Sequence, residues 1–282
     1  MPFVTPLRYP GGKGRLGRWL GELLRYNRIS GGLFIEPYAG GAGAATYLLL
    51  EGYVNHIVIN DIDPLVHAFW WTVLNDTDKL LAMIKETPVT IDTWNKLKLL
   101  TRAPNNHTKT ELGFATLFLN RTNRSGILDG GVIGGKKQDG PYKLDARYNQ
   151  NELCRRIQRI AARRHCIDLY QMDALELLAI YKGQLPSKAL VYLDPPYYEK
   201  GSELYTNFYK PGDHARIASV IASIMSPWLV TYDDCGPIRT LYKQFPMTIF
   251  PIKYSTGIKR REANEVMFYH NVRLPREPVL IR

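Results

Sequence analysis

Cysteine and long apolar segments are scarce in this sequence, and each scarcity excludes a class of protein. The 282 residues contain three cysteines, Cys154, Cys166 and Cys235, and no CxxC pair, which excludes a disulfide scaffold and favours a reducing, cytoplasmic location. No apolar run approaches the roughly 18 residues that span a bilayer, so no membrane segment is expected. Prolines near the start argue against a signal peptide. The histidines are scattered, so no metal site is expected.

Basic residues outnumber acidic ones, 37 to 26, and the formal net charge is +11. The excess is concentrated in residues 121–164, where eleven bases and four acids contribute +7, and a second basic cluster follows at 259–261. Part of this charge lies on an expected helix at 153–161 and is compatible with a solvated helix face. A one-sided excess with few interleaved acids nevertheless favours a polyanionic partner, most often nucleic acid.

Short apolar runs alternate with helical patterns along most of the chain. Strands are expected at residues 33–35, 56–59, 167–170, 190–193, 228–232, 247–252 and 265–269, and helices at 44–50, 174–181, 213–225 and 236–245. This alternation is typical of an α/β fold with a parallel, Rossmann-like sheet. Residues 75–148 differ, because helical stretches lead there into a glycine-rich, basic segment. The sequence therefore predicts an α/β domain formed by 1–74 and 149–282, with a helical insertion at 75–148.

A glycine-rich turn follows the first expected strand. Gly40, Gly41 and Gly43 lie between that strand and the next helix, where a ligand can approach the backbone. Asp61 ends the second strand and follows Gly43 by 18 residues, close to the spacing of about twenty at which an acid binds ribose in nucleotide folds. The glycines do not form GxGxxG, so a nucleoside ligand without a pyrophosphate fits better. S-adenosylmethionine is the leading candidate, and an ordinary turn with a surface aspartate is the alternative.

The segment Asp194-Pro195-Pro196-Tyr197 follows the apolar strand at 190–193 directly. Two prolines cannot continue a ladder, so they end the strand at the sheet edge where open α/β sheets bind ligands. The motif places a carboxylate, carbonyl acceptors and an aromatic ring at that edge.

Those groups suit methyl transfer to the exocyclic amine of adenine, whose lone pair is delocalised into the ring. The Asp194 carboxylate and the Pro195 carbonyl would accept its two N–H groups and favour a more tetrahedral nitrogen, so that the lone pair points at the methyl donor. Tyr197 would stack on a base taken out of the duplex.

At this point the chain resembles the Dam-type (D12 class, group alpha) DNA adenine N6-methyltransferases. The matching segments span nearly the whole chain and lie at 7–13, 34–43, 60–62, 120–122 and 194–197. The resemblance implies a Rossmann-like S-adenosylmethionine-dependent methyltransferase sheet with a helical target-recognition insertion. It also implies that cofactor contacts are made by Tyr9, Lys13, Tyr38, Gly40, Asp61, Asp173 and Asp194.

In that family the recognition region lies between the second strand and the catalytic strand, which here corresponds to 75–148. The resemblance therefore implies double-stranded DNA as the partner, with contacts from Arg121, Asn123, Arg124, Lys136 and Lys137. Members that read GATC follow the Asn-Arg pair with an intercalating aromatic, an asparagine and an arginine. Residues 122–129 contain no aromatic and have Asp129 near the position of that arginine, so GATC is not predicted as the target.

Other functions explain part of the pattern. A nicotinamide-dependent oxidoreductase would account for the glycine turn but not for the motif at 194–197. A nucleic-acid-binding protein with a non-catalytic Rossmann-like fold would account for the charge alone. Methylation of cytosine N4, of RNA adenine or of protein glutamine are alternatives within methyl transfer. Cytosine C5 methylation is not expected, because its cysteine nucleophile usually follows a proline and none of the three cysteines here does. A site-specific, adenine-specific DNA methyltransferase explains most; a monomer and a restriction-modification role are compatible with the sequence.

Overall fold

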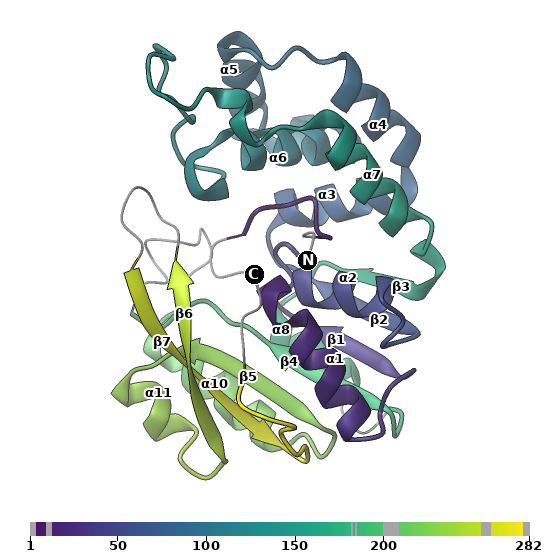
Figure 1. The fold of residues 1–282 in the computed structure, drawn as a ribbon, viewed down its shortest axis with the longest axis vertical. Helices are drawn as coiled ribbons and strands as arrows, with labels where there is room; N and C mark the ends of the chain where they lie inside the picture. Colours follow the sequence, from purple (N-terminus) through teal and green to yellow (C-terminus); the bar gives the residue numbers. More distant parts are fainter. Residues whose placement is uncertain are drawn as a thin grey trace.

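The computed structural model describes residues 4–9, 13–181, 183, 185–199, 209–254 and 261–278. Within them, seven strands form one sheet in the order β3-β2-β1-β4-β5-β7-β6 (Figure 1). The strands are β1 (Leu33–Glu36), β2 (His56–Asn60), β3 (Ile167–Tyr170), β4 (Ala189–Leu193), β5 (Trp228–Asp233), β6 (Met247–Tyr254) and β7 (Arg261–His270). The five neighbouring strands β3, β2, β1, β4 and β5 pair in parallel, and β7 is antiparallel to both β5 and β6. The predicted Rossmann-like α/β sheet is confirmed.

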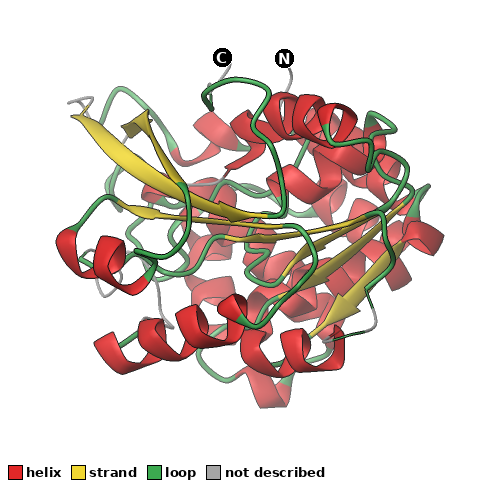
Figure 2. Cartoon of the chain, turned by 90° about the horizontal axis from the view of Figure 1, so that it is seen from below, coloured by secondary structure: helices red, strands yellow, loops and turns green. Residues whose placement is uncertain are grey.

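The central strands are apolar on both faces because helices cover both sides of the sheet (Figure 2). On one side the core includes Phe34 and Tyr192, together with residues of α1 (Gly17–Tyr26), α2 (Gly43–Leu50) and α3 (Pro64–Asn75). On the other side Ile35 and Val191 pack with α8 (Ala174–Tyr181), α10 (Pro211–Ala222) and α11 (Gly236–Leu241). Alternate residues of one strand therefore belong to two different cores.

One helix of the framework was not predicted. Helix α1 is amphipathic, and its buried residues Trp19, Leu20, Leu23 and Leu24 recur at the helical period. The same pattern in the sequence was the signal for it.

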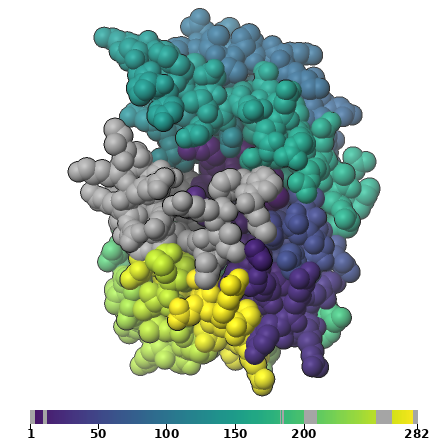
Figure 3. Space-filling model, in the orientation of Figure 1, coloured from purple at the N-terminus to yellow at the C-terminus, as the bar shows by residue number. Residues whose placement is uncertain are grey.

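A group of helices extends from one end of the sheet and corresponds broadly to the predicted insertion (Figures 1 and 3). It contains α4 (Thr77–Glu86), α5 (Ile91–Leu100) and α6 (Lys109–Thr122), with α6 packed along α3. Helix α7 (Gln150–Ala161), which the sequence assigned to the α/β domain, packs against α4 and α3. The boundaries at 75 and 148 remain a prediction. No helix in the described part of the chain is long and apolar enough to cross a membrane.

Candidate active site at the carboxyl ends of the strands

The strand order reverses between β1 and β4, because the chain continues from β1 to β2 and β3 on one side and from β4 to β5 on the other. In open α/β sheets this switch point is where ligands bind, at the carboxyl ends of the strands. Asp194 directly follows β4 at this edge, and Glu36 is the last residue of β1. The structure therefore places the predicted motif and the glycine turn at one site.

The glycine turn is built around Gly40, whose φ of 45° is in the left-handed region. Its N–H donates to Asp61 Oδ2 at 2.8 Å, and its carbonyl accepts from Trp70 Nε1 at 2.9 Å. A Cβ at Gly40 would lie 2.7 Å from the ring of Tyr9, so only glycine lets this ring pack against the turn. Tyr9, Gly40 and Asp61, which the resemblance assigned to the cofactor, are thus brought together.

The Asp61 carboxylate also accepts from the N–H of Asp63, at 3.0 Å. Burial raises the pKa of Asp61 to about 7, because the charged form is desolvated and the two N–H donors only partly offset that cost. A carboxyl held at this edge by backbone N–H groups can accept hydrogen bonds from a ribose.

The side chain of Asn60 connects three strand ends. Its Nδ2 donates to the carbonyls of Pro37 and Met172, and its Oδ1 accepts from the Met172 N–H at 3.0 Å. Asp173 follows directly, and its carboxylate accepts from the Leu175 N–H at 2.8 Å at the start of α8. Asn60 thereby places Asp173 at the edge that also holds Asp61.

Tyr38 was also assigned to the cofactor. Its hydroxyl accepts a hydrogen bond from the Tyr209 hydroxyl at 3.2 Å, and the two rings meet edge to face. Burial raises the pKa of Tyr209, and the nearby carboxylates of Asp173 and Asp61 raise it further. Tyr38, Tyr209 and the two carboxylates therefore lie around one region of the sheet edge.

Lys13 lies at the centre of a buried charged network. It begins the short 3-10 helix η1 (Lys13–Leu16) and is 3% exposed. Its Nζ lies 2.8 Å from Asp194 Oδ1 and 3.1 Å from Asp194 Oδ2, and also 3.1 Å from Glu265 Oε1. Burial alone lowers the pKa of Lys13, but Asp194 and Glu265 outweigh it and raise this pKa above its usual value. Lys13 is therefore an ammonium shared by two carboxylates.

Asp194 is oriented by two donors. Its Oδ1 accepts from Lys13 and from the Thr231 hydroxyl, the latter at 2.8 Å, whereas Oδ2 accepts from Lys13 at the longer distance. The side chain is 18% exposed, more than either Lys13 or Glu265. Among the three charged groups of this network, Asp194 is thus the one that can meet a substrate. Pro195, the third predicted catalytic residue, is buried beside it.

Tyr197 does not have the surroundings expected of a stacking ring. It is 2% exposed, and its hydroxyl donates to Glu265 Oε1 at 2.5 Å and accepts from Lys13 Nζ at 3.5 Å. Stacking on a base remains a prediction and requires this ring to become exposed. In the structure as it stands, Tyr197 holds the charged network together.

Sequence reasoning missed three polar residues of this site: Glu36, Thr231 and Glu265. Each lies in an apolar strand and is buried, and a polar residue inside such a run was the available signal. Burial raises the pKa of Glu36 to about 8, although its carboxylate accepts from the Ala45 N–H at 3.1 Å. Glu265 is on β7 and Thr231 on β5, so local motifs could not connect them to Asp194.

The predicted DNA-binding residues separate into two groups. Arg124, Lys136 and Lys137 are exposed on the segment after α6. Asn123 is fully buried: its Oδ1 accepts from Trp94 Nε1 at 2.6 Å, and its Nδ2 donates to the carbonyls of Ile127 and Leu128. Its side chain thus closes this loop from inside, and a DNA contact by Asn123 stays a prediction that requires the loop to open.

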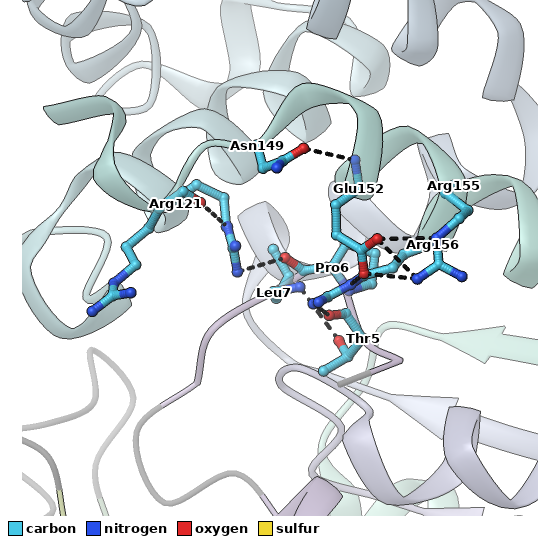
Figure 4. A network of polar contacts seen from close by, with 9 residues as sticks. Thr5, Pro6, Leu7, Arg121, Asn149, Glu152, Arg155 and Arg156 are labelled. Carbon is cyan, nitrogen blue, oxygen red and sulfur yellow. Dashed lines mark hydrogen bonds and ion pairs between the residues drawn. The ribbon is translucent and has the colours of Figure 1, made fainter. Parts of the chain in front are cut away.

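Arg121 is mostly buried and connects the helical region to the N-terminal segment, residues 4–9 (Figure 4). Its Nε donates to the Arg147 carbonyl at 2.7 Å and its Nη1 to the Pro6 carbonyl at 3.4 Å, while Arg156 donates to the Thr5 carbonyl at 3.0 Å. Asn120 accepts from the Arg8 N–H and donates to the Arg8 carbonyl, both at 2.7 Å. The N-terminal segment is therefore held by the helical region along its length.

The side chains at this contact form a second charged group, which we call the arginine junction: Arg8, Arg121, Arg147 and Arg156. Burial, followed by the charges of the other three arginines, lowers the pKa of Arg121 to about 10. Among the described residues, Arg156 pairs with Glu152, whereas no acid forms an ion pair with the other three. Within the same part of the chain, Arg8 Nη1 is buried and has no hydrogen-bond partner. The junction can accept an anion.

Comparisons with known proteins identify a family. The sequence model of the D12 class N6 adenine-specific DNA methyltransferase family matches residues 9–264. No curated protein sequence matches the chain.

Similar solved structures include a proposed RNA methyltransferase from Pyrococcus horikoshii, at 8% identity and a TM-score of 0.44, covering 93% of this chain and 84% of that one. An rRNA methyltransferase from Streptomyces viridochromogenes has 14% identity and a TM-score of 0.36, with 89% and 82% covered. A SAM-dependent methyltransferase from Neisseria gonorrhoeae has 12% identity and a TM-score of 0.34, with 90% and 72% covered.

Proposed function

The chain belongs to the D12 class N6 adenine-specific DNA methyltransferase family, and we propose that it transfers a methyl group from S-adenosylmethionine to N6 of an adenine in double-stranded DNA. One observation carries the proposal. Asp194, at the carboxyl end of the switch-point strand β4, is partly exposed and is oriented by Lys13 and Thr231. That arrangement suits a hydrogen-bond acceptor for an amine.

The residues at the edge of β1, β2 and β3 fit the cofactor. Gly40 has no side chain of its own and lets the Tyr9 ring pack against the turn, and Asp61 offers a carboxylate beside it. Asp173 and Tyr38 lie around the same edge and would bind the nucleoside part. When bound, S-adenosylmethionine supplies an electrophilic methyl group.

Asp194 and Pro195 would position the substrate amine. Asp194 Oδ2 accepts a hydrogen bond from one N–H of the amine, and the Pro195 carbonyl accepts one from the other. Pro195 and the proline after it have no N–H group that could compete for these acceptors. Holding both hydrogens favours a more tetrahedral nitrogen, whose lone pair is less delocalised into the ring and points at the methyl donor. Positioning of the amine supplies most of the acceleration. The proton released from N6 passes to the Asp194 carboxylate and then to water.

Lys13 would orient Asp194. Its ammonium lies 2.8 Å from Asp194 Oδ1 and fixes the direction in which the carboxylate meets the amine hydrogens. Because Asp194 must stay a good acceptor, sharing Lys13 with Glu265 limits how strongly the ammonium competes with the substrate.

Two features support DNA as the partner. The exposed bases of the segment after α6 would hold the duplex, and a backbone phosphate would supply the anion missing from the arginine junction. An adenine inside a duplex cannot reach Asp194, so we infer that the base is flipped out. RNA adenine or cytosine N4 as the acceptor remains the alternative.

The test is incubation of the protein with labelled methyl donor and unmethylated genomic DNA, single-stranded DNA or RNA. We expect N6-methyladenine in duplex DNA at one recurring sequence, mapped at base resolution. Label in RNA, or on cytosine N4, would overturn the DNA adenine assignment.

The matched variants are Asp194→Ala and Asp78→Asn, the second a change of an exposed carboxylate on α4. Asp194→Ala should abolish transfer while donor binding is weakened at most, and Asp78→Asn should leave both unchanged. Full activity in Asp194→Ala would remove the proposed site.

A further inference from the structure

Glu265 is the most deeply buried acid of the site, and it lies on the antiparallel strand β7 rather than on a switch-point strand. Its exposure is 0%, and it is followed on the strand by buried Val266, Met267 and Phe268. A carboxylate in such surroundings loses its hydration, which is unfavourable unless partners compensate it. A residue with a purely structural role at this position would more simply be apolar.

Two contacts of Glu265 among the described residues lead toward Asp194. Its Oε1 lies 3.1 Å from Lys13 Nζ and accepts from the Tyr197 hydroxyl at 2.5 Å. Lys13 in turn contacts both oxygens of Asp194, and Tyr197 belongs to the same motif as Asp194. Glu265 is thus connected to Asp194 through one intervening residue in two ways, through Lys13 and through Tyr197.

We propose that Glu265 is a positioning residue for methyl transfer, which holds Lys13 and Tyr197 so that Asp194 presents a strong acceptor to the substrate amine. The inference rests on the proposed function and extends it to a strand that carries none of the predicted motifs. Glu265 need not touch substrate or cofactor.

The reason is the sharing of one ammonium between two carboxylates. While Lys13 is divided between Glu265 and Asp194, the negative charge on Asp194 is only partly neutralised. Without the charge of Glu265, Lys13 pairs with Asp194 alone and weakens it as an acceptor for the amine hydrogens. The same change weakens Asp194 as the acceptor of the proton that leaves N6 when the nitrogen–carbon bond forms and the carbon–sulfur bond breaks.

The test is Glu265→Gln, which keeps the size and the hydrogen-bond acceptor for Tyr197 but removes the charge. We expect the single-turnover rate of methyl transfer to fall about 10- to 100-fold, while the dissociation constants for donor and DNA change by less than about 3-fold. A residue that merely supports the fold would change binding and melting temperature together with the rate.

A double-mutant cycle with Lys13→Met isolates the route. If Glu265 acts through Lys13, Glu265→Gln should have almost no further effect on the rate in the Lys13→Met background. If the rate losses of the two single variants multiply in the double variant, the proposal is overturned. A rate of the single variant Glu265→Gln within about 2-fold of the wild-type rate would overturn it as well. Should Glu265→Gln not fold, Tyr197→Phe removes the hydroxyl that contacts Glu265 and Lys13 and should slow transfer about 3- to 10-fold without weakening donor binding.

The wild-type protein, assayed beside these variants on duplex DNA, separates the two levels of inference. An inactive wild type overturns the proposed function and this inference with it. An active wild type with an equally active Glu265→Gln overturns the role of Glu265 alone.

Discussion

Two groups of charged side chains in this protein differ in whether the chain itself neutralises them. At the active site, Lys13 lies against two carboxylates within 3.1 Å, so the cluster is closed within the protein. At the arginine junction, Arg8, Arg121 and Arg147 have no acidic partner among the described residues. Under the proposed function this difference would be a division of labour, in which the first cluster prepares the reaction and a polyanion completes the second.

The N-terminal segment connects the two clusters. Arg156 donates to the Thr5 carbonyl and Arg121 to the Pro6 carbonyl. The Thr5 hydroxyl donates to the Gly41 carbonyl in the glycine turn. Tyr9 packs on the same turn, and Lys13 follows four residues later. DNA bound at the arginine junction would therefore contact the residues that hold the N-terminal segment, and that segment contacts the glycine turn directly.

The largest effect should come from breaking the closed cluster. Lys13→Met leaves the neighbouring carboxyl groups of Asp194 and Glu265 without the cation that they share, so their charges are no longer compensated. We expect the rate of methyl transfer to fall about 1,000-fold, measured in single turnover with saturating donor and DNA.

Lys13→Arg is the control for this change, because it keeps the charge. It should retain more activity than Lys13→Met at equal folded content, judged by circular dichroism. Equal activity of Lys13→Met and the wild type would show that the cluster is not part of the reaction.

A second effect should appear in stability, because Glu36 is a buried acid of the same region that forms no ion pair among the described residues. Its pKa is raised by burial to about 8, so the folded state holds the proton more tightly than the unfolded state does. The associated stability is complete below the usual carboxyl pKa and is lost as the pH rises toward 8. The loss between pH 5 and 8.5 should be about 2 to 4 kcal/mol.

Thermal unfolding of Glu36→Gln tests this. The variant stays neutral, so its melting temperature should fall less between pH 5 and 8.5 than that of the wild type. Some dependence should remain, because burial raises the pKa of Asp61 to about 7 in the same direction. Identical pH dependence in both proteins would mean that Glu36 is ionised without cost.

The same two regions show what could be predicted from sequence. All seven strands were expected, because a strand buried on both faces is a short apolar run between turns. Asp194 and Asp61 could be found because each directly follows such a run. Helix α1 was missed although its periodicity is strong.

The rest depended on contacts between distant residues. Lys13 and Asp194 are 181 residues apart, and no spacing rule connects either to Thr231 or Glu265. The burial of Asn123 was not expected, for a related reason. Its position in a basic, glycine-rich segment suggested exposure, but Trp94, 29 residues earlier, binds its side chain inside the fold.

Breaking the open cluster should mainly weaken DNA binding. Arg8→Gln combined with Arg147→Gln removes two charges that the protein does not neutralise, one of them with a buried nitrogen. We expect duplex affinity to fall about 10- to 30-fold at low salt, and the slope of log K against log salt to decrease by about two. Fluorescence anisotropy over a salt series measures both.

Arg155→Gln is the matched control for the junction. Arg155 is exposed and already paired with Glu152 at 2.8 Å, so its loss should leave the salt slope unchanged. An equal effect of Arg155→Gln would mean that overall charge, and not the uncompensated junction, holds the DNA.

The smallest effect is expected from the exposed bases after α6. Lys136→Gln with Lys137→Gln removes two fully solvated charges, whose interaction with phosphate is screened by water, so affinity should fall only about 2- to 5-fold. The salt slope should still decrease, because counterion release counts neutralised phosphates and not their burial. Lys243→Gln, beyond α11 and far from this segment, is the charge control (Figure 1). An unchanged slope in the double variant would move the interface elsewhere, for instance to the cluster at Lys259 and Arg260, which lies outside the described residues.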